Sequence, residues 1–243
     1  DDIEARHGEA GARFVALLRD CAATLFDMVR EYGIDAEAEQ TGWVQPVHTP
    51  GRIKISERRV AQWSKRGAPV ELLDRAHVRS MLGSDAWHGG FWNRTGGHVN
   101  PLALARGLAH AAIAAGARIH GQTPALGYSR QGDRWVVRTP SGEVRARALV
   151  LATNAYTGEF SARLAPRIAR ELVPIRSWQM ATQVLPDDVR ASIIPGRQAM
   201  SDTHGDLYFA RLDARNRLIT GGAILAPFDR RERLKRMIAE RLS

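Results

Sequence analysis

The clearest pattern of apolar and polar positions lies in the middle of the chain. In the stretch LALARGLAHAAI, apolar side chains recur at steps of three and four residues, which is the spacing of one face of an α-helix. Asn100 and Pro101, just before it, are a favourable N-cap and first helical residue, and Gly116 stands where a left-handed C-cap belongs. The pattern therefore predicts a helix over residues 101–115.

The segments after this helix have the pattern of strands. Three short strand-like segments follow, at residues 117–120, 124–129 and 135–139. Residues 140–143 (PSGE) are of types that favour a turn. Residues 148–152 (ALVLA) are continuously apolar, as in a strand that is buried on both faces. That run ends at Thr153 and Asn154, and the carboxyl ends of buried strands are where open α/β sheets bind ligands. We expect a meander followed by a cofactor-binding edge.

The flanking regions mix helical and strand-like patterns. An amphipathic helix is expected over residues 10–32, and shorter helices at 57–65, 71–82 and 230–241. Strand-like pieces occur at 41–49, 52–55 and 172–185, and a hairpin is expected from 206–212 and 218–222. This order predicts a fold of class α/β and α+β, with two interleaved domains.

Three segments of the chain, GGHVNPLALARGLAHAAIAAGARI, TPALGY and RALVLATNAYT, resemble the FAD-dependent D-amino-acid oxidase family, which includes glycine, sarcosine and gamma-glutamylputrescine oxidases. They are most similar to the gamma-glutamylputrescine oxidase-like branch. Weaker similarity extends through Thr41-Gly42-Trp43 and LLDRAHVRSMLG upstream, and through LVPIRSWQMAT and DLYFARLDARNRLITGGA downstream. The resemblance covers most of the chain and implies FAD as the cofactor.

The resemblance also implies how the chain is divided. Residues 1–40 and 96–160 correspond to part of a flavin-binding, Rossmann-like domain, and residues 41–95 and 161–243 to part of a mixed-sheet substrate domain. The Gly-x-Gly-x-x-Gly fingerprint of such domains is missing, since no two glycines here are separated by a single residue. We therefore expect an internal fragment of a longer protein that, by itself, holds FAD weakly, because the pyrophosphate lacks its cradle.

Four positions match segments that approach the cofactor in the family. The resemblance implies that the backbone of Ala125 approaches the adenine, where relatives often carry valine, and a main-chain contact tolerates either side chain. It also implies that the backbone of Ala152, Thr153 and Asn154 faces the cofactor. The alternatives are an ordinary strand alanine at residue 125 and a simple turn at Asn154.

Tyr208, Arg211 and His98 are the candidate substrate-binding residues. The family often places a tyrosine hydroxyl near the substrate at the position of Tyr208; the alternative is a core tyrosine with a hydrated hydroxyl. Arg211 as a carboxylate clamp needs a bulge or turn to join Tyr208, because residues three apart in a regular strand face opposite sides. His98 either faces the flavin or is a satisfied structural histidine. The catalytic residues stay open.

Composition excludes several other functions. The 243 residues carry a formal net charge of +9, but the arginines are spread along the chain, so no nucleic-acid partner is expected. No apolar run is long enough for a membrane helix, and no metal-ligand spacing such as His-Glu-x-x-His occurs. The single Cys21 excludes an internal disulfide, which agrees with a cytoplasmic location. Cys21 also lies on an apolar helical stripe, which predicts a buried, inert thiol.

The chemistry implied by the resemblance is oxidation of a primary or secondary amine or amino acid to an imine, with oxygen as the acceptor. The flavin carries the hydride chemistry, and a small-molecule amine or amino acid is the expected partner. Two alternatives stay open. One is a relative that oxidises a hydroxy acid, and the other is a truncated or degenerate product without catalysis. The oligomeric state is also open.

Overall fold

The computed structural model describes residues 2–158, 164–172, 175, 177–205, 207–223, 232–233, 235–237 and 239. The chain forms two compact units, one of residues 1–115 with 177–243 and the other of residues 116–176. The first unit has a sheet of seven strands and the second a sheet of three. The expected helix at residues 230–241 lies largely outside the described residues. None of the described helices combines the length and the apolar composition needed to span a membrane.

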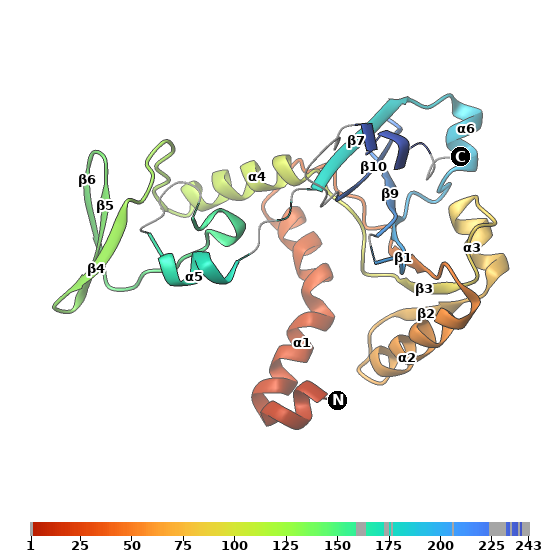
Figure 1. Ribbon diagram of the computed structural model, residues 1–243, viewed down its shortest axis with the longest axis horizontal. Coiled ribbons are helices and arrows are strands. Elements are labelled where there is room, and N and C mark those ends of the chain that lie inside the picture. Colours follow the sequence, from red (N-terminus) through yellow and green to blue (C-terminus); the bar gives the residue numbers. More distant parts are fainter. Residues whose placement is uncertain are drawn as a thin grey trace. The chain divides into compact units, whose positions relative to one another are not determined.

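The sheet of the first unit is mixed (Figure 1). Its strands follow the order β2-β3-β1-β8-β9-β10-β7. Their bounds are β1 Trp43–Pro46, β2 Val70–Leu73, β3 Gly90–Asn93, β7 Ser177–Val184, β8 Ala199–Ser201, β9 Phe209–Leu212 and β10 Arg217–Ala223. β1 and β8 run parallel, while the other neighbours run antiparallel. The expected mixed sheet is confirmed, and so is the hairpin, which β9 and β10 form.

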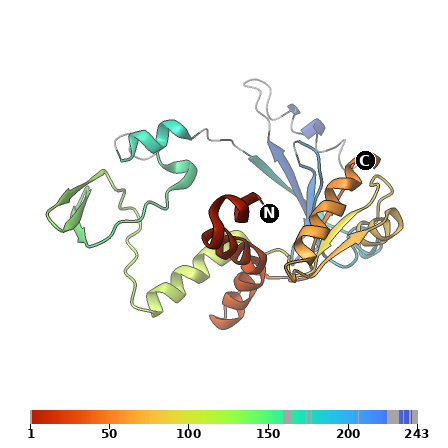
Figure 2. The same cartoon turned by 90° about the horizontal axis from the view of Figure 1, so that it is seen from below.

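Helices pack against this sheet and beside it. In the first unit they are α1 (Asp2–Glu31), α2 (Ile53–Ser64), α3 (Arg75–Leu82), α4 (Pro101–Ala114) and α6 (Asp187–Ser192), with the 3-10 turn η1 (Pro50–Arg52). α2 lies along β2 and β3 (Figure 2), and α3 contacts β2. The strand expected at residues 52–55 is wrong, because Pro50 opens a 3-10 turn that leads directly into α2.

The end of α3 shows how tightly this part of the unit is packed. The main apolar cluster joins the sheet to α3 and consists of Val44, Leu73, Val78, Leu82, Ile194, Met200, Leu212 and Leu218. α3 ends at Gly83, whose φ of 76° is left-handed. A Cβ at this position would lie 1.7 Å from the carbonyl oxygen of Ser192. Glycine is therefore required here both by the backbone conformation and by the lack of space.

α1 and α4 are joined by a second apolar cluster. Val29, Ile34 and Ala36 are buried there, and Leu104 and Leu108 of α4 pack against them. The helix expected at residues 101–115 is confirmed to within one residue, with the side chain of its N-cap accepting a hydrogen bond from the backbone of the first turn at 3.2 Å.

Cys21 corrects one expectation. Its thiol is exposed rather than buried, and Sγ donates to the carbonyl oxygen of Leu18 at 3.2 Å. Of the apolar stripe that contains Cys21, Val29 is buried, but Leu17, Leu18 and Met28 are exposed. Val15 and Phe26, which are buried, lie beside this stripe. The expected burial of this stripe is therefore wrong for most of its residues, because helical spacing identifies an apolar face but does not say that another element covers it.

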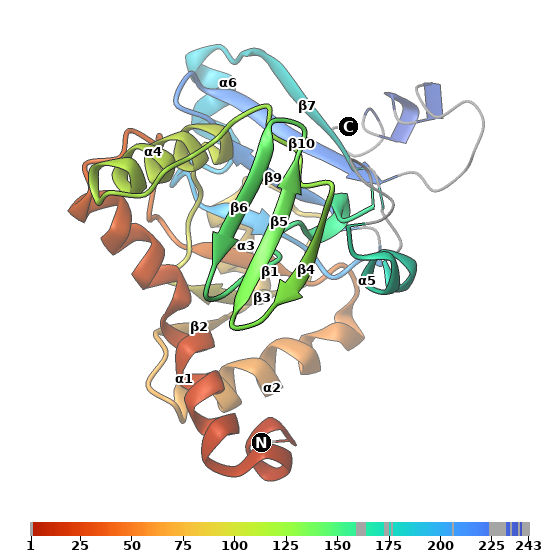
Figure 3. The same ribbon diagram turned by 90° about the vertical axis from the view of Figure 1, so that its left-hand side faces the viewer.

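The second unit contains a three-stranded antiparallel meander (Figure 3). Its elements are β4 Gly127–Gln131, β5 Arg134–Thr139, β6 Gly142–Ala146, the 3-10 turn η2 Asn154–Tyr156 and α5 Pro166–Glu171. The strands expected at residues 117–120 and 148–152 are wrong, and Val150 is 83% exposed. A strand buried on both faces needs neighbours that pair with it and helices that cover it, and within the described residues neither segment pairs with another strand.

Candidate active site

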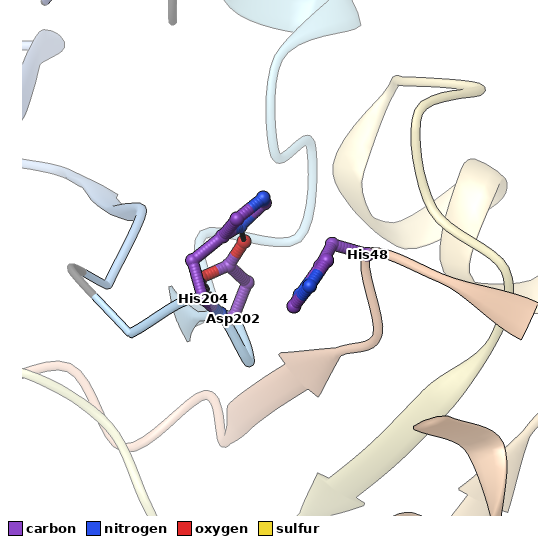
Figure 4. Close-up of side chains that lie close together, drawn as sticks. All are labelled: His48, Asp202 and His204. Atoms are coloured by element: carbon purple, nitrogen blue, oxygen red, sulfur yellow. Dashed lines mark hydrogen bonds and ion pairs between the residues drawn. The ribbon is translucent and has the colours of Figure 1, made fainter. Parts of the chain in front are cut away.

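Four side chains with reactive or polar groups meet at one edge of the seven-stranded sheet. His48 follows β1, while Asp202 and His204 follow β8 and Tyr208 directly precedes β9. Because β1 and β8 are parallel, with Trp43 opposite Ala199, their carboxyl ends lie at the same edge. Figure 4 shows His48, Asp202 and His204 side by side.

Asp202 organises the loop between β8 and β9. The residue is fully buried, and its Oδ1 accepts the backbone N–H groups of His204 at 3.0 Å and of Tyr208 at 2.9 Å. Its Oδ2 accepts a short hydrogen bond from Nδ1 of His204. The backbone N–H of Asp202 in turn donates to the carbonyl oxygen of Tyr208 at 2.9 Å. One carboxylate therefore ties both ends of the loop together, as burial of a charged group requires.

The rings above this carboxylate form a stack. The centroids of His48 and His204 are 3.7 Å apart with 17° between the planes, and those of His204 and Tyr208 are 4.3 Å apart with 15° between them. The Nδ1 atom of His48 lies 2.9 Å from the hydroxyl oxygen of Thr203. Burial, followed by the charges of His204 and Arg52, lowers the pKa of His48, which favours the neutral form of this ring.

His48, Asp202 and His204 are also the one set of His, Cys, Asp or Glu in the described part of the chain whose ligand atoms lie within 4.8 Å of one another. The lone pairs of imidazole nitrogens lie in the ring planes, and two nearly parallel rings direct them side by side rather than towards one point. Both oxygens of Asp202 already accept hydrogen bonds. The geometry therefore favours a hydrogen-bonded stack over an ion-binding site.

Arg211 and His98 make none of the contacts described above for this stack, and the charge of Arg211 acts on the ring of His98. Arg211, in β9, lines a pocket of about 290 Å³ with Asn100 at the start of α4. His98 is 7% exposed, its Nε2 donates to the carbonyl oxygen of Arg197 at 3.2 Å, and its Nδ1 has no hydrogen-bond partner within the described residues. Burial lowers the pKa of His98, Glu39 opposes this, and the charge of Arg211 adds to the lowering. Tyr208 does not line the pocket of Arg211, as the alternation of side chains along extended backbone leads one to expect.

An ion pair of Arg197 and Glu39, here called the charged knot, lies next to His98 and is hydrogen-bonded to it. Arg197 donates from Nε and Nη2 to the two carboxylate oxygens of Glu39, both at 2.6 Å. The backbone of Glu39 pairs with that of His98 through hydrogen bonds of 2.9 and 3.0 Å. These contacts hold the backbone and Nε2 of His98, but its Nδ1 has no partner within the described residues, so both roles expected for this residue stay predictions.

The four expected cofactor positions lie in the second unit. Ala125 lines a cavity of about 460 Å³ with Thr123, Val137 and Val144. His120 and Glu143 also line this cavity, and apolar walls with a few polar groups of this kind suit a planar heteroaromatic ring such as adenine. The chain offers no matching binding site for the pyrophosphate of FAD, because it carries no Gly-x-Gly turn.

Ala152, Thr153 and Asn154 lie at the start of the turn η2. The hydroxyl oxygens of Thr153 and Thr157 are 2.8 Å apart, and the Thr157 hydroxyl donates to the carbonyl oxygen of Asn154 at 2.6 Å. Asn154 has a φ of 42°, in the left-handed region that asparagine tolerates. Local hydrogen bonds thus fix this turn, and its backbone roles towards a cofactor stay predictions.

Solved flavoprotein structures share this fold. The L-proline dehydrogenase from P. horikoshii superimposes with a TM-score of 0.74 over 92% of this chain and 60% of that chain, at 18% identity. The glycine oxidase from Geobacillus kaustophilus superimposes with a TM-score of 0.64 over 94% of this chain and 60% of that chain, at 23% identity. The chain therefore has the fold of these two proteins.

The model of the DAO family, described as FAD dependent oxidoreductase, matches residues 3–242. The chain belongs to this family, whose members use FAD, and the resemblance stated from the sequence is confirmed. Gamma-glutamylputrescine oxidoreductase of Escherichia coli (strain K12) is 29% identical over 227 residues, which are 93% of this chain and 52% of that protein. The chain thus spans about half the length of this relative.

Sequence reasoning singled out Tyr208 but missed its neighbours His48, Asp202 and His204. The pair Asp202 and His204 carries a weak local signal, since residues two apart in an extended segment share a face. Nothing in the sequence connects residue 48 with this pair, because they meet only through the pairing of β1 with β8.

Proposed function

We propose that the protein to which this chain belongs uses FAD to oxidise a small primary or secondary amine or amino acid to the corresponding imine, with oxygen as the electron acceptor. The observation that carries the proposal is the position of Tyr208, held by a buried carboxylate and a ring stack at a sheet edge, in a chain of the FAD-dependent oxidoreductase family. The relative named gamma-glutamylputrescine oxidoreductase supports an amine as the substrate class.

In this proposal FAD, when bound, would supply the hydride-accepting chemistry at the carbon next to the amine, and this chain would supply binding and orientation. The groove beside Ala125 holds the adenine, and the backbone of residues 152–154 faces the cofactor. The hydroxyl of Tyr208 donates a hydrogen bond to a polar group of the substrate. The substrate reacts as the neutral amine, and the imine is hydrolysed in water. No general base on the protein is required for this sequence of events.

We assign Tyr208 the substrate contact and leave Arg211 and His98 to the framework on the other side of the strand. The hydrogen bonds of His98 within the charged knot support this assignment. A carboxylate clamp by Arg211 would need the substrate on the side of Asn100. The single cysteine is compatible with a reducing compartment, and a cytoplasmic location is part of the proposal.

The proposal is tested on the full-length gene product with a panel of amines and amino acids. The panel contains gamma-glutamylputrescine, glycine, proline and iminodiacetate, with a 2-hydroxy acid as the competing class. Release of peroxide on turnover with an amine is the expected result. Flavin reduction by the hydroxy acid alone would replace the proposed substrate class, and no reduction by any member would favour a product without catalysis.

The role of Tyr208 is tested with Tyr208→Phe, which removes only the hydroxyl. Loss of one neutral hydrogen bond to the substrate should raise KM by about threefold to tenfold, corresponding to roughly 0.5–1.5 kcal/mol. Tyr128→Phe is the matched control, because Tyr128 lies in β4 of the second unit and stacks edge-on against Trp135. Unchanged KM in Tyr208→Phe would remove this residue from the substrate site.

A further inference from the structure

The ring stack restricts Tyr208 more than an ordinary half-buried tyrosine. Its backbone is held at the N–H by Oδ1 of Asp202 and at the carbonyl oxygen by the N–H of Asp202, both at 2.9 Å. Its ring lies nearly parallel to that of His204, with centroids 4.3 Å apart. The hydroxyl oxygen of tyrosine lies on the long axis of the ring and its O–H bond prefers the ring plane. A stacking contact that holds both the ring centroid and the ring plane therefore holds the place and the direction of the hydroxyl.

The orientation of His204 is itself determined from two sides. Nδ1 of His204 donates to Oδ2 of Asp202, and the same residue's backbone N–H donates to Oδ1 at 3.0 Å. On the face away from Tyr208, the ring of His48 stacks at 3.7 Å. His48 is in turn anchored by the Thr203 hydroxyl, which lies 2.9 Å from its Nδ1. His204 therefore lies between the rings of His48 and Tyr208 and is hydrogen-bonded to a buried carboxylate. Figure 4 shows His204 with His48 and Asp202.

We propose that Asp202, His204 and His48 are positioning residues for Tyr208, and that they act on the substrate only through the direction of its hydroxyl. The proposal rests on the proposed function, in which that hydroxyl contacts the amine substrate. His204 is the central member, because it is the one that touches the Tyr208 ring. Asp202 fixes the plane of His204, and His48 supports it from behind.

This role makes a specific prediction for a double-mutant cycle in the full-length gene product. His204→Ala frees the Tyr208 ring and should lower kcat/KM for the amine by about threefold to tenfold, as Tyr208→Phe does. In the Tyr208→Phe background, His204→Ala should have no further effect, because the hydroxyl that it positions is already absent. His204→Phe restores a flat ring in the stack and should return kcat/KM to within about twofold of the wild type.

The controls separate positioning from folding. His204 is 34% exposed, so its replacement by alanine leaves no large buried cavity. His77→Ala is the matched variant, because His77 also pairs with an aspartate, Asp74, at 2.8 Å, but both of these side chains are exposed to solvent. It should leave kcat/KM unchanged. Thermal unfolding and flavin absorbance of each variant report whether the fold and the cofactor are retained.

Each outcome bears on the proposal. Non-additive effects of His204→Ala and Tyr208→Phe, with rescue by His204→Phe, support it. Additive effects overturn it, since His204 then contacts the substrate or another group. Wild-type kinetics of His204→Ala beside an impaired Tyr208→Phe overturn it and leave the proposed function intact. Wild-type kinetics of Tyr208→Phe overturn both. A change on adding Zn²⁺ or EDTA that His204→Ala abolishes would identify an ion site instead.

Discussion

Arg197 is the residue whose removal we expect to destabilise the first unit most clearly. Its guanidinium donates twice to Glu39 at 2.6 Å, once to Oδ1 of Asn216 at 2.8 Å and once to the carbonyl oxygen of Asp213 at 2.8 Å. The bonds to Glu39 raise the pKa of Arg197 above its usual range. Arg197→Ala removes all four hydrogen bonds and leaves the carboxylate of Glu39 without its partner.

The magnitude follows from the burial of this pair. The side chains of Arg197 and Glu39 are 22% and 23% exposed, so both charges are largely withdrawn from water. Removing one partner of a buried ion pair costs about 3–5 kcal/mol, and the remaining exposure favours the lower end, about 3 kcal/mol. In a protein of this size each kcal/mol lowers the Tm by roughly 2–4 °C, so the expected fall is about 6–12 °C.

Urea unfolding followed by circular dichroism measures this change as a shift of the midpoint at constant slope. Arg13→Ala is the control, because Arg13 and Glu9 form an ion pair at 2.8 Å whose side chains are 67% and 89% exposed. Such a pair contributes less than about 1 kcal/mol. Arg197→Lys keeps the charge but loses the two-pronged geometry, and should lie between wild type and Arg197→Ala. If Arg197→Ala costs no more than Arg13→Ala, the assignment of this knot as framework is refuted.

Three further predictions concern single features. Gly83→Ala should cost at least about 1–3 kcal/mol in urea unfolding, because its Cβ meets the Ser192 carbonyl at a left-handed φ; a neutral result contradicts this. Burial raises the pKa of Asp213, but the bonds from Arg217 and Arg215 outweigh it and lower the pKa overall. The stability that the Asp213 carboxylate contributes is thus complete above the unfolded pKa of about 4 and is lost as the pH falls through the folded pKa. Asp213→Asn should therefore make the urea midpoint depend less on pH over this acid range. The 243-residue chain alone should lose FAD on desalting, and a stoichiometric yellow preparation would overturn this expectation.

Elements set by local contacts were predictable from the sequence. The helix at Pro101–Ala114 depends on its N-cap, which bonds three residues ahead, and on a repeating apolar face. The hairpin of β9 and β10 depends on a short connection in which the Asp213 carboxylate accepts the backbone N–H of Arg217 at 2.9 Å. Both signals lie within a few residues of sequence, where pattern reasoning is strongest.

Elements that depend on distant partners were not predictable. Residues 148–152 have the composition of a buried strand, yet composition does not supply the neighbouring strands that its backbone must pair with. The thiol of Cys21 lies on an apolar helix face, yet an apolar face does not ensure that another element packs against it. In both cases the sequence shows that a segment is apolar enough to be buried, but burial itself depends on whether other parts of the chain pack against it.

The candidate site is the strongest example of this difference. Tyr208 was found through family resemblance, and the pair of Asp202 and His204 lies within six residues of it, but His48 and Thr203 are 155 positions apart in the chain. They meet because β1 and β8 pair in parallel with Trp43 opposite Ala199. A one-residue shift of that register would turn the side chains of one strand to the opposite face. The position of His48 behind the stack is thus set by the register of the sheet, and sequence periodicity alone carries no information about that register.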